Sequence, residues 1–98
     1  MMGITVTLKG QVYEDVGLEW TRYAADGSPA LRLWWEDELL CTATVFLADA
    51  TPAAGCVWIK DWSENEGVLN SLIEAGIVEP TGRVAQAGYV IAQEARVL

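Results

Sequence analysis

Histidine is absent from this chain, and basic side chains are scarce. Imidazole is the usual general base near neutral pH and the commonest transition-metal ligand, so its absence excludes catalytic triads, histidine-metal sites and histidine phosphochemistry. Six Lys and Arg residues stand against 14 Asp and Glu residues, which gives a net charge of −8. Because nucleic-acid binding depends on cationic neutralisation of phosphates, this balance argues against direct binding to DNA or RNA.

Cysteine is also scarce, and the motifs of familiar enzyme classes are missing. Cys41 and Cys56 are the two cysteines, and they form no CxxC pair. We expect buried thiols, with a disulfide as the alternative if the strands that carry them are neighbours. Neither has a histidine partner to activate it, and no phosphate-cradling glycine loop or GxSxG motif occurs. The sequence therefore predicts a non-enzymatic protein without a cofactor.

Long apolar runs are missing as well. Uncharged runs such as residues 39–48 are too short to cross a bilayer. The first residues lack the basic and apolar regions of a secretory signal, so we expect a cytoplasmic protein. A hydrophobic content of 52% predicts a packed globule rather than a disordered chain, and the length fits one domain over residues 1–98.

One segment has a clear helical period, with four apolar side chains recurring on one face: Val68, Leu69, Leu72 and Ile73. Ser63 and Glu66 have the spacing of a capping box, which places the helix start near Glu64. Gly76 can adopt the left-handed conformation that ends a helix, and Ile77 can then contact Leu72 in a Schellman ending. The sequence predicts a three-turn helix over about residues 64–75.

The rest of the chain reads as short strands with alternating apolar residues, separated by turns. We expect turns at Glu14–Gly17, Asp26–Pro29 and Glu36–Glu38. The expected strands cover residues 4–9, 18–23, 31–35, 42–47 and 57–59, with one or two more within 83–98. The predicted fold is α+β, an antiparallel and mostly meandering sheet of five to six strands with the helix packed on one face.

Two adjacent tryptophans mark the third expected strand. Trp34 and Trp35 must point to opposite faces of the sheet, because side chains alternate along a strand. Phe46 likewise lies on the face opposite the apolar residues of the fourth expected strand. Either another part of the chain covers the outward aromatic side chains, or they bind a partner.

A meander would bring two acidic turns to the same end of the sheet. The carboxylates concerned are Glu14, Asp15, Glu36, Asp37 and Glu38. A fifth strand antiparallel to the fourth would add Asp61 and Glu64 at the start of the helix. In one interpretation these are solvated turn residues, and Glu64 suits a helix N-terminus through the helix dipole.

In the other interpretation this acidic rim imitates nucleic acid or docks on the basic groove of a partner, with Trp34 or Phe46 as an apolar anchor. Two alternatives remain open. Clustered carboxylates could bind Mg²⁺ or Ca²⁺, although no calcium-loop spacing occurs, or another small ligand. In the last alternative the chain is a homo-oligomeric structural protein that buries Trp34 and Phe46 against a second copy.

Three stretches together resemble a family of short proteins carried by bacteriophages, plasmids and other mobile elements of bacteria: Lys60-Asp61-Trp62-Ser63-Glu64-Asn65-Glu66-Gly67, Ala75-Gly76-Ile77-Val78-Glu79-Pro80-Thr81-Gly82-Arg83 and Gly88-Tyr89-Val90. The similarity covers most of the chain and is strongest over residues 57–90. These motifs mark the family without an assigned chemistry. By analogy with other small acidic mobile-element proteins, the resemblance implies an inhibitor of a host nucleic-acid-handling defence protein, of the anti-CRISPR kind, with a CRISPR effector as the partner.

Overall fold

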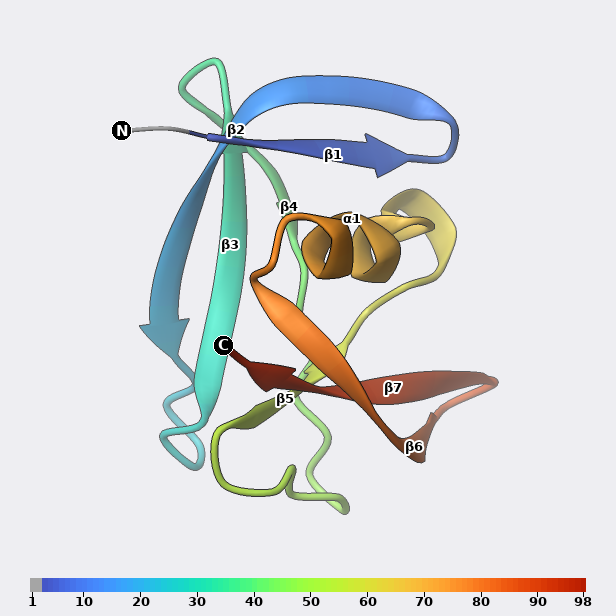
Figure 1. Cartoon of the computed structure of the whole chain (residues 1–98). Helices are drawn as coiled ribbons and strands as arrows, with labels where there is room; N and C mark the ends of the chain where they lie inside the picture. The colour runs from blue at the N-terminus through green and yellow to red at the C-terminus, as the bar shows by residue number, and fades with distance from the viewer. Residues whose placement is uncertain (1–2) are drawn as a thin grey trace.

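Two antiparallel sheets and one short helix make up the computed structural model, which describes residues 3–98 (Figure 1). Four strands form the first sheet as a meander: β1 (Ile4–Leu8), β2 (Gln11–Arg22), β3 (Pro29–Trp35) and β4 (Glu38–Thr42). Three form the second, in the order β5-β7-β6: β5 (Cys56–Ile59), β6 (Val78–Ala87) and β7 (Val90–Val97). The α+β class is confirmed, whereas the described residues form seven strands in two sheets rather than five to six strands in one.

The predicted turn at Glu14–Gly17 is wrong, because β2 runs through it. The register between β1 and β2 shifts between the Ile4–Val16 and Val6–Tyr13 pairs, so β2 contains a bulge at residues 14 and 15. Asp15 has a φ of 60°, a left-handed conformation that Asp tolerates better than most residues. The turn between β1 and β2 lies earlier, at residues 9 and 10.

The fourth strand was predicted too late in the chain. β4 occupies residues 38–42. In the rest of the expected strand, residues 43–47, only Thr44 forms a β-bridge, which joins it to Ile59 of β5. This segment leaves the first sheet and runs along β5, where Val45 N donates to Trp58 O. The predicted strand at 57–59 is confirmed, and the C-terminal strands begin at Val78 rather than near residue 83.

The helix is shorter than predicted and begins differently. A 3₁₀ turn, η1 (Ser63–Asn65), precedes α1 (Val68–Glu74). The predicted capping box does not form, since Ser63 contributes its backbone carbonyl to Glu66 N rather than a side-chain cap. Asp61 takes that role, because its Oδ1 accepts from the N–H groups of Gly67, at 2.9 Å, and Leu69, at 3.3 Å.

The predicted end of the helix is confirmed. Ile77 N donates to Leu72 O and Gly76 N donates to Ile73 O, both at 3.0 Å, which is the bond pattern of a Schellman motif. Gly76 adopts the left-handed conformation with a φ of 75°.

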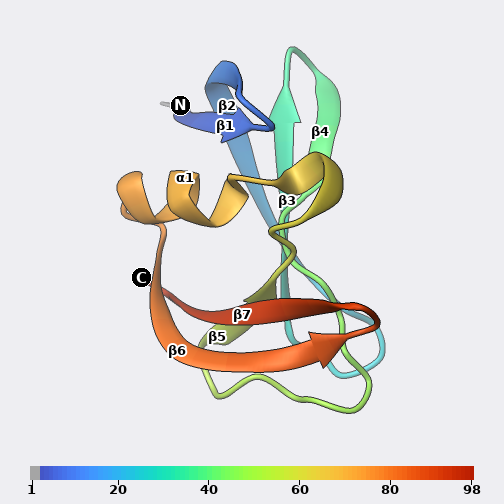
Figure 2. The ribbon, with the colours of Figure 1, turned by 90° about the vertical axis from the view of Figure 1, so that its right-hand side faces the viewer.

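The helix lies between the two sheets and covers the open edge of β1 (Figure 2). Thr7 N donates to Ser71 Oγ at 2.9 Å, and Lys9 N donates to Glu66 O at 2.8 Å. Gly67 is required at this approach, because a Cβ there would lie 2.5 Å from Thr7 O. Both sheets and α1 contribute to one core of fully buried side chains, which includes Val6, Val16, Leu31, Leu33, Ile59, Val68, Leu72 and Val78.

A buried carboxylate ties the loop before β5 to the second sheet. Glu94 on β7 is 1% exposed; its Oε2 accepts from Ala53 N at 2.9 Å and from Arg83 Nη1 at 2.8 Å. Its Oε1 accepts from Thr81 Oγ1 at 2.6 Å. Burial raises the pKa of Glu94, but the Ala53 amide, the Thr81 hydroxyl and the Arg83 guanidinium outweigh it and hold that pKa below the ordinary value.

Within residues 3–98, no helix has the length and apolar character needed to cross a membrane.

Candidate functional site

An open hollow of about 600 Å³ lies where β2 and β3 approach the turn that follows β3. We call it the acidic hollow and define it by its lining residues: Glu14, Asp15, Gly17, Trp34, Trp35, Glu36 and Asp37. Gly17 pairs with Trp34 across the two strands, so both face away from the core residue Leu33. Because Gly17 has no side chain, the sheet is hollow beside the indole of Trp34.

Three of the four carboxylates stand on left-handed backbone. Glu36 and Asp37 have φ values of 51° and 64° and form the two-residue turn between the paired residues Trp35 and Glu38. Such turns favour Asn-Gly, because both central residues need a positive φ. Asp15 occupies the bulge of β2 with a φ of 60°. Asp tolerates this conformation better than most residues, whereas Glu36 occupies a position that favours Asn or Gly.

The indole of Trp34 is held in place by two neighbours on the outer face of the sheet. Its Nε1 donates to Glu19 Oε1 at 2.9 Å. The guanidinium of Arg32 lies 5.2 Å from the centroid of the Trp34 ring, and Arg32 Nε is 3.4 Å from Glu19 Oε1. The chain therefore already shows that Trp34 accepts a guanidinium over its ring. Trp35 points to the other face and packs edge-on against Tyr13, with ring centroids 5.1 Å apart.

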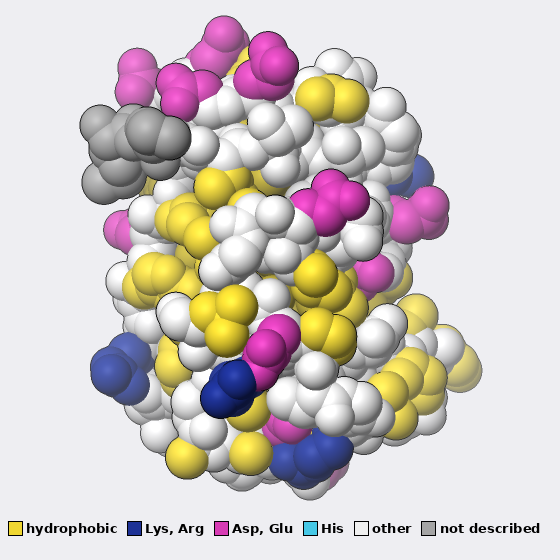
Figure 3. All heavy atoms as spheres, in the orientation of Figure 1, with side chains coloured by type: hydrophobic (Ala, Val, Ile, Leu, Met, Phe, Trp, Pro, Cys, Tyr) yellow, Lys and Arg dark blue, Asp and Glu magenta, His cyan; other side chains and the backbone are white. Residues whose placement is uncertain are grey.

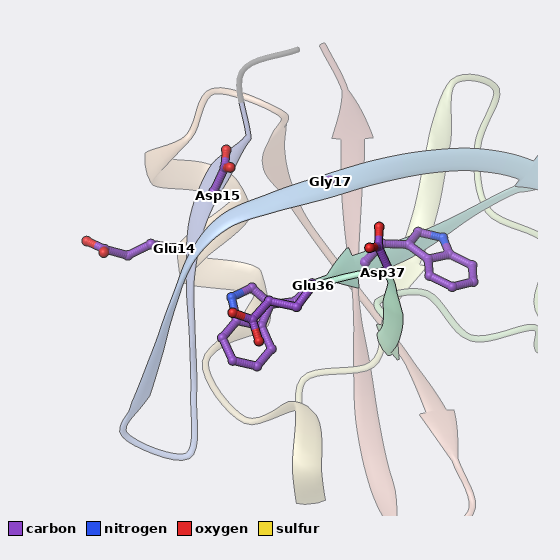
Figure 4. A pocket seen from close by; sticks show the side chains of 7 residues that line it. Glu14, Asp15, Gly17, Glu36 and Asp37 are labelled. Carbon is purple, nitrogen blue, oxygen red and sulfur yellow. The ribbon is translucent and has the colours of Figure 1, made fainter.

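The four carboxylates of the acidic hollow do not converge on one point. Glu14 extends away from the other labelled side chains in Figure 4. Asp15 Oδ1 accepts from Gly3 N at 3.2 Å, and no side-chain hydrogen bond or ion pair of Glu14, Glu36 or Asp37 occurs within residues 3–98. Over the same residues, no group of three or more Asp, Glu or Cys side chains could hold a metal ion. The arrangement therefore creates a region of negative charge beside Trp34 and Trp35 rather than a chelating site.

The acidic end of the molecule is visible in the space-filling view. Asp and Glu side chains gather at its top, above the helix, whereas most of the visible Lys and Arg side chains lie over the lower half (Figure 3). The net charge of −8 is therefore distributed unevenly over the surface. A basic partner would meet the strongest attraction at the acidic end.

The structure brings together most, but not all, of the predicted rim. Glu14, Asp15, Trp34, Glu36 and Asp37 line the acidic hollow, although the first two belong to a bulge rather than a turn. Glu38 lies just beyond it, as the first residue of β4.

Three predicted partner-binding residues lie elsewhere. Asp61 caps α1, and Glu64 Oε1 accepts from Lys60 Nζ at 2.8 Å, which lowers the pKa of Glu64. Phe46 packs against Tyr23, with ring centroids 5.6 Å apart, so it does not form an outward anchor next to Trp34. The separation arises because the segment after β4 crosses to the second sheet instead of continuing the first.

Sequence reasoning missed Gly17 as the position that leaves the hollow open, and Glu19 and Arg32 as the residues that hold Trp34. The alternation of β2 and β3 could have placed all three on the outer face, but their pairing depends on the strand register.

Cys41 and Cys56 are both free and buried, as predicted. Burial, with a smaller effect of Glu64, raises the pKa of Cys41 to about 11, so this thiol is protonated and unreactive at neutral pH.

Comparison of the chain with models of known protein families, with curated proteins and with solved structures finds no match.

Proposed function

We propose that this chain is a non-enzymatic protein that binds a basic surface of a nucleic-acid-handling host protein through the acidic hollow. The observation that carries the proposal is the lining of one open hollow by four carboxylates, from two separate segments, together with Trp34 and Trp35. Like charges repel one another, and the turn at Glu36 and Asp37 would be favoured more strongly by Asn-Gly. A cationic partner would convert this repulsion into attraction.

The chemistry of the hollow favours arginine as the group that enters it. A guanidinium can stack on an indole while its N–H groups donate hydrogen bonds to carboxylates, whereas an ammonium acts as a compact point charge. Within residues 3–98, neither Glu36 nor Asp37 forms an ion pair, so both carboxylates can accept from an incoming guanidinium. Trp34 then supplies the apolar contact that charge alone lacks.

Charge reversal at the turn tests this role directly. The Glu36→Lys, Asp37→Lys variant is expected to bind a labelled oligo-arginine peptide at least about tenfold more weakly than the wild type, because like charges at a contact cost several kcal/mol. Wild-type affinity is expected to fall with added salt. Fluorescence anisotropy measures both effects.

The matched control reverses two exposed acidic residues outside the hollow, Asp49→Lys and Glu74→Lys, which gives the same net charge. It is expected to retain most of the wild-type affinity. Equal losses in the two variants would show that net charge, and not the acidic hollow, determines binding.

We further propose that the partner is a defence protein of the CRISPR effector class and that the chain acts in the cytoplasm. The support for this proposal is the resemblance to mobile-element proteins, together with the gathering of Asp and Glu side chains at one end of the surface (Figure 3). DNA binding by a purified CRISPR effector should decrease as the chain is added, and the Glu36→Lys, Asp37→Lys variant should lose this effect. An effector that binds DNA undisturbed would remove the defence role while leaving the basic-partner role testable with the peptide.

A further inference from the structure

Of the four sheet edges that residues 3–98 form, three are at least partly covered by the chain itself. The edge of β1 bonds to the helix segment through Thr7 and Lys9. The edge of β5 is covered by the crossing segment, since Val45 N donates to Trp58 O and Lys60 N donates to Ala43 O. On β4 the carbonyl of Thr42 accepts from Asn65 Nδ2 at 2.8 Å, and the strand begins with the charged Glu38. These devices protect edges from pairing with other chains.

The fourth edge, β6, is open in its second half. β6 pairs with β7 through Val84–Gln93 to Ala87–Val90, and Gly88 and Tyr89 form a two-residue turn. The pair next to such a turn is hydrogen-bonded, and bonded and non-bonded pairs alternate along the ladder. The backbone N–H and C=O groups of Val84 and Gln86 therefore point away from β7. No backbone hydrogen bond from outside the sheet reaches them within the described residues.

Side chains around this open edge are uncharged and partly apolar. Residues 84–93 contain no Asp, Glu, Lys or Arg. Val84 is 58% exposed and Ile91 is 50% exposed, and the register places both on the same face of the hairpin. Tyr89 at the tip is fully exposed. The hairpin forms the hydrophobic projection at the lower right of Figure 3.

We propose that the open edge of β6 binds the same edge of a second copy of this chain. An antiparallel arrangement with its two-fold axis at Ala85 places Val84 opposite Gln86 of the second copy, and Gln86 opposite its Val84. All four outward backbone groups of each strand then find partners, and the two three-stranded sheets become continuous. Such an isologous contact is closed, so it forms a dimer and not a fibre.

The outward backbone groups of Val84 and Gln86 are self-complementary about Ala85, which favours a second copy of this chain at this edge. Two chains with a net charge of −8 repel each other over most of their surfaces, and the uncharged hairpin is where they can approach without placing carboxylates in contact. The first half of β6 is blocked by Pro80 and by the register shift between Pro80 and Val84. Pairing is therefore confined to the segment from Val84 to Ala87. The acidic hollow lies on the other sheet, so this proposal stands independently of the proposed function.

Gln86→Pro is the variant that separates edge pairing from folding. Proline removes the outward N–H of residue 86, and a proline is tolerated on an edge strand whose N–H faces solvent. Sedimentation equilibrium should show the wild type associating in the micromolar to millimolar range and Gln86→Pro remaining a monomer. Gln86→Ala keeps the N–H and should still dimerise.

Amide hydrogen exchange gives a second, residue-specific readout. The N–H groups of Val84 and Gln86 should become protected as the wild-type concentration rises. If Gln86→Pro fails to fold by far-UV circular dichroism, Val84→Lys serves instead, because it places one charge on each copy at the contact. A wild type that stays monomeric at millimolar concentration would overturn the proposal. So would a dimer that persists in Gln86→Pro or in Val84→Lys, or one that is lost equally in Gln86→Ala.

Discussion

Replacing Glu94 with alanine is expected to lower the free energy of unfolding by about 2–4 kcal/mol, because the hydrogen bonds that this buried carboxylate accepts are lost and the Ala53 amide is left without its acceptor. The change leaves a cavity and removes the acceptor of the Ala53 amide, the Thr81 hydroxyl and the Arg83 guanidinium. Denaturant unfolding followed by tryptophan fluorescence measures the effect. Glu94→Gln should fall between the wild type and the alanine variant, because it retains the shape and one acceptor oxygen.

The ion pair between Glu79 and Arg96 provides the matched control. Both side chains are about half exposed, at 46% and 56%. Exposed pairs contribute at most about 1 kcal/mol, so Glu79→Ala should cost far less than Glu94→Ala. Equal costs would show that the burial of Glu94 has no special role in stability.

The pH dependence of the Glu94 variant has a definite sign. The folded state holds the pKa of Glu94 below its unfolded value, so the stability that this group supplies is present above the unfolded pKa. It is lost as the pH falls through the folded pKa. The wild type should therefore lose stability in acid more steeply than Glu94→Ala, and parallel curves would contradict the assignment.

The second prediction concerns the acidic turn, where function and stability are expected to oppose each other. Glu36→Asn, Asp37→Gly installs the residues that a turn with two positive φ values favours. It should raise the free energy of unfolding by about 1 kcal/mol, the cost of holding a side chain in left-handed backbone. The same variant should weaken binding of a basic partner, because it removes two of the four carboxylates of the acidic hollow.

A second hairpin offers a control for the turn effect. Lys9 and Gly10 form the two-residue turn between β1 and β2 with φ values of 50° and 78°. Lys9→Asn should raise stability by roughly 0.5 kcal/mol through the same backbone effect and leave peptide binding unchanged. A turn variant at Glu36 and Asp37 that is less stable than the wild type would show that these acidic residues serve the fold.

Local signals predicted the parts of the fold that depend on neighbouring residues. The apolar face of α1 and its Schellman ending follow from residues within one turn of each other, and the hairpin at Asp26–Pro29 follows from its turn residues. The start of the helix could not be predicted this way, because Asp61 reaches the amides of Gly67 and Leu69 across six and eight positions. The order of β5, β7 and β6 likewise depends on contacts between distant segments.

The sequence predicted most of the residues that line the acidic hollow, but it placed Glu14 and Asp15 there for the wrong structural reason. Glu14 and Asp15 lie at the same end of the first sheet as Glu36 and Asp37 because β2 pairs with β3, and they belong to a bulge rather than a turn. Phe46 was expected to be an outward aromatic side chain of the sheet because residues 42–47 resemble a continuing strand, whereas it packs against Tyr23. Alternation along the chain cannot show that this segment changes sheets.

The most direct test of the acidic hollow compares two variants that each lack two negative charges. A labelled oligo-arginine peptide is titrated at low salt with the wild type, with Glu36→Asn, Asp37→Gly and with Asp49→Asn, Glu74→Gln, and binding is followed by fluorescence anisotropy. We predict that the turn variant binds at least about tenfold more weakly while remaining fully folded, and that the second variant stays close to the wild type. Equal affinities in the two variants would contradict the acidic hollow as the binding site.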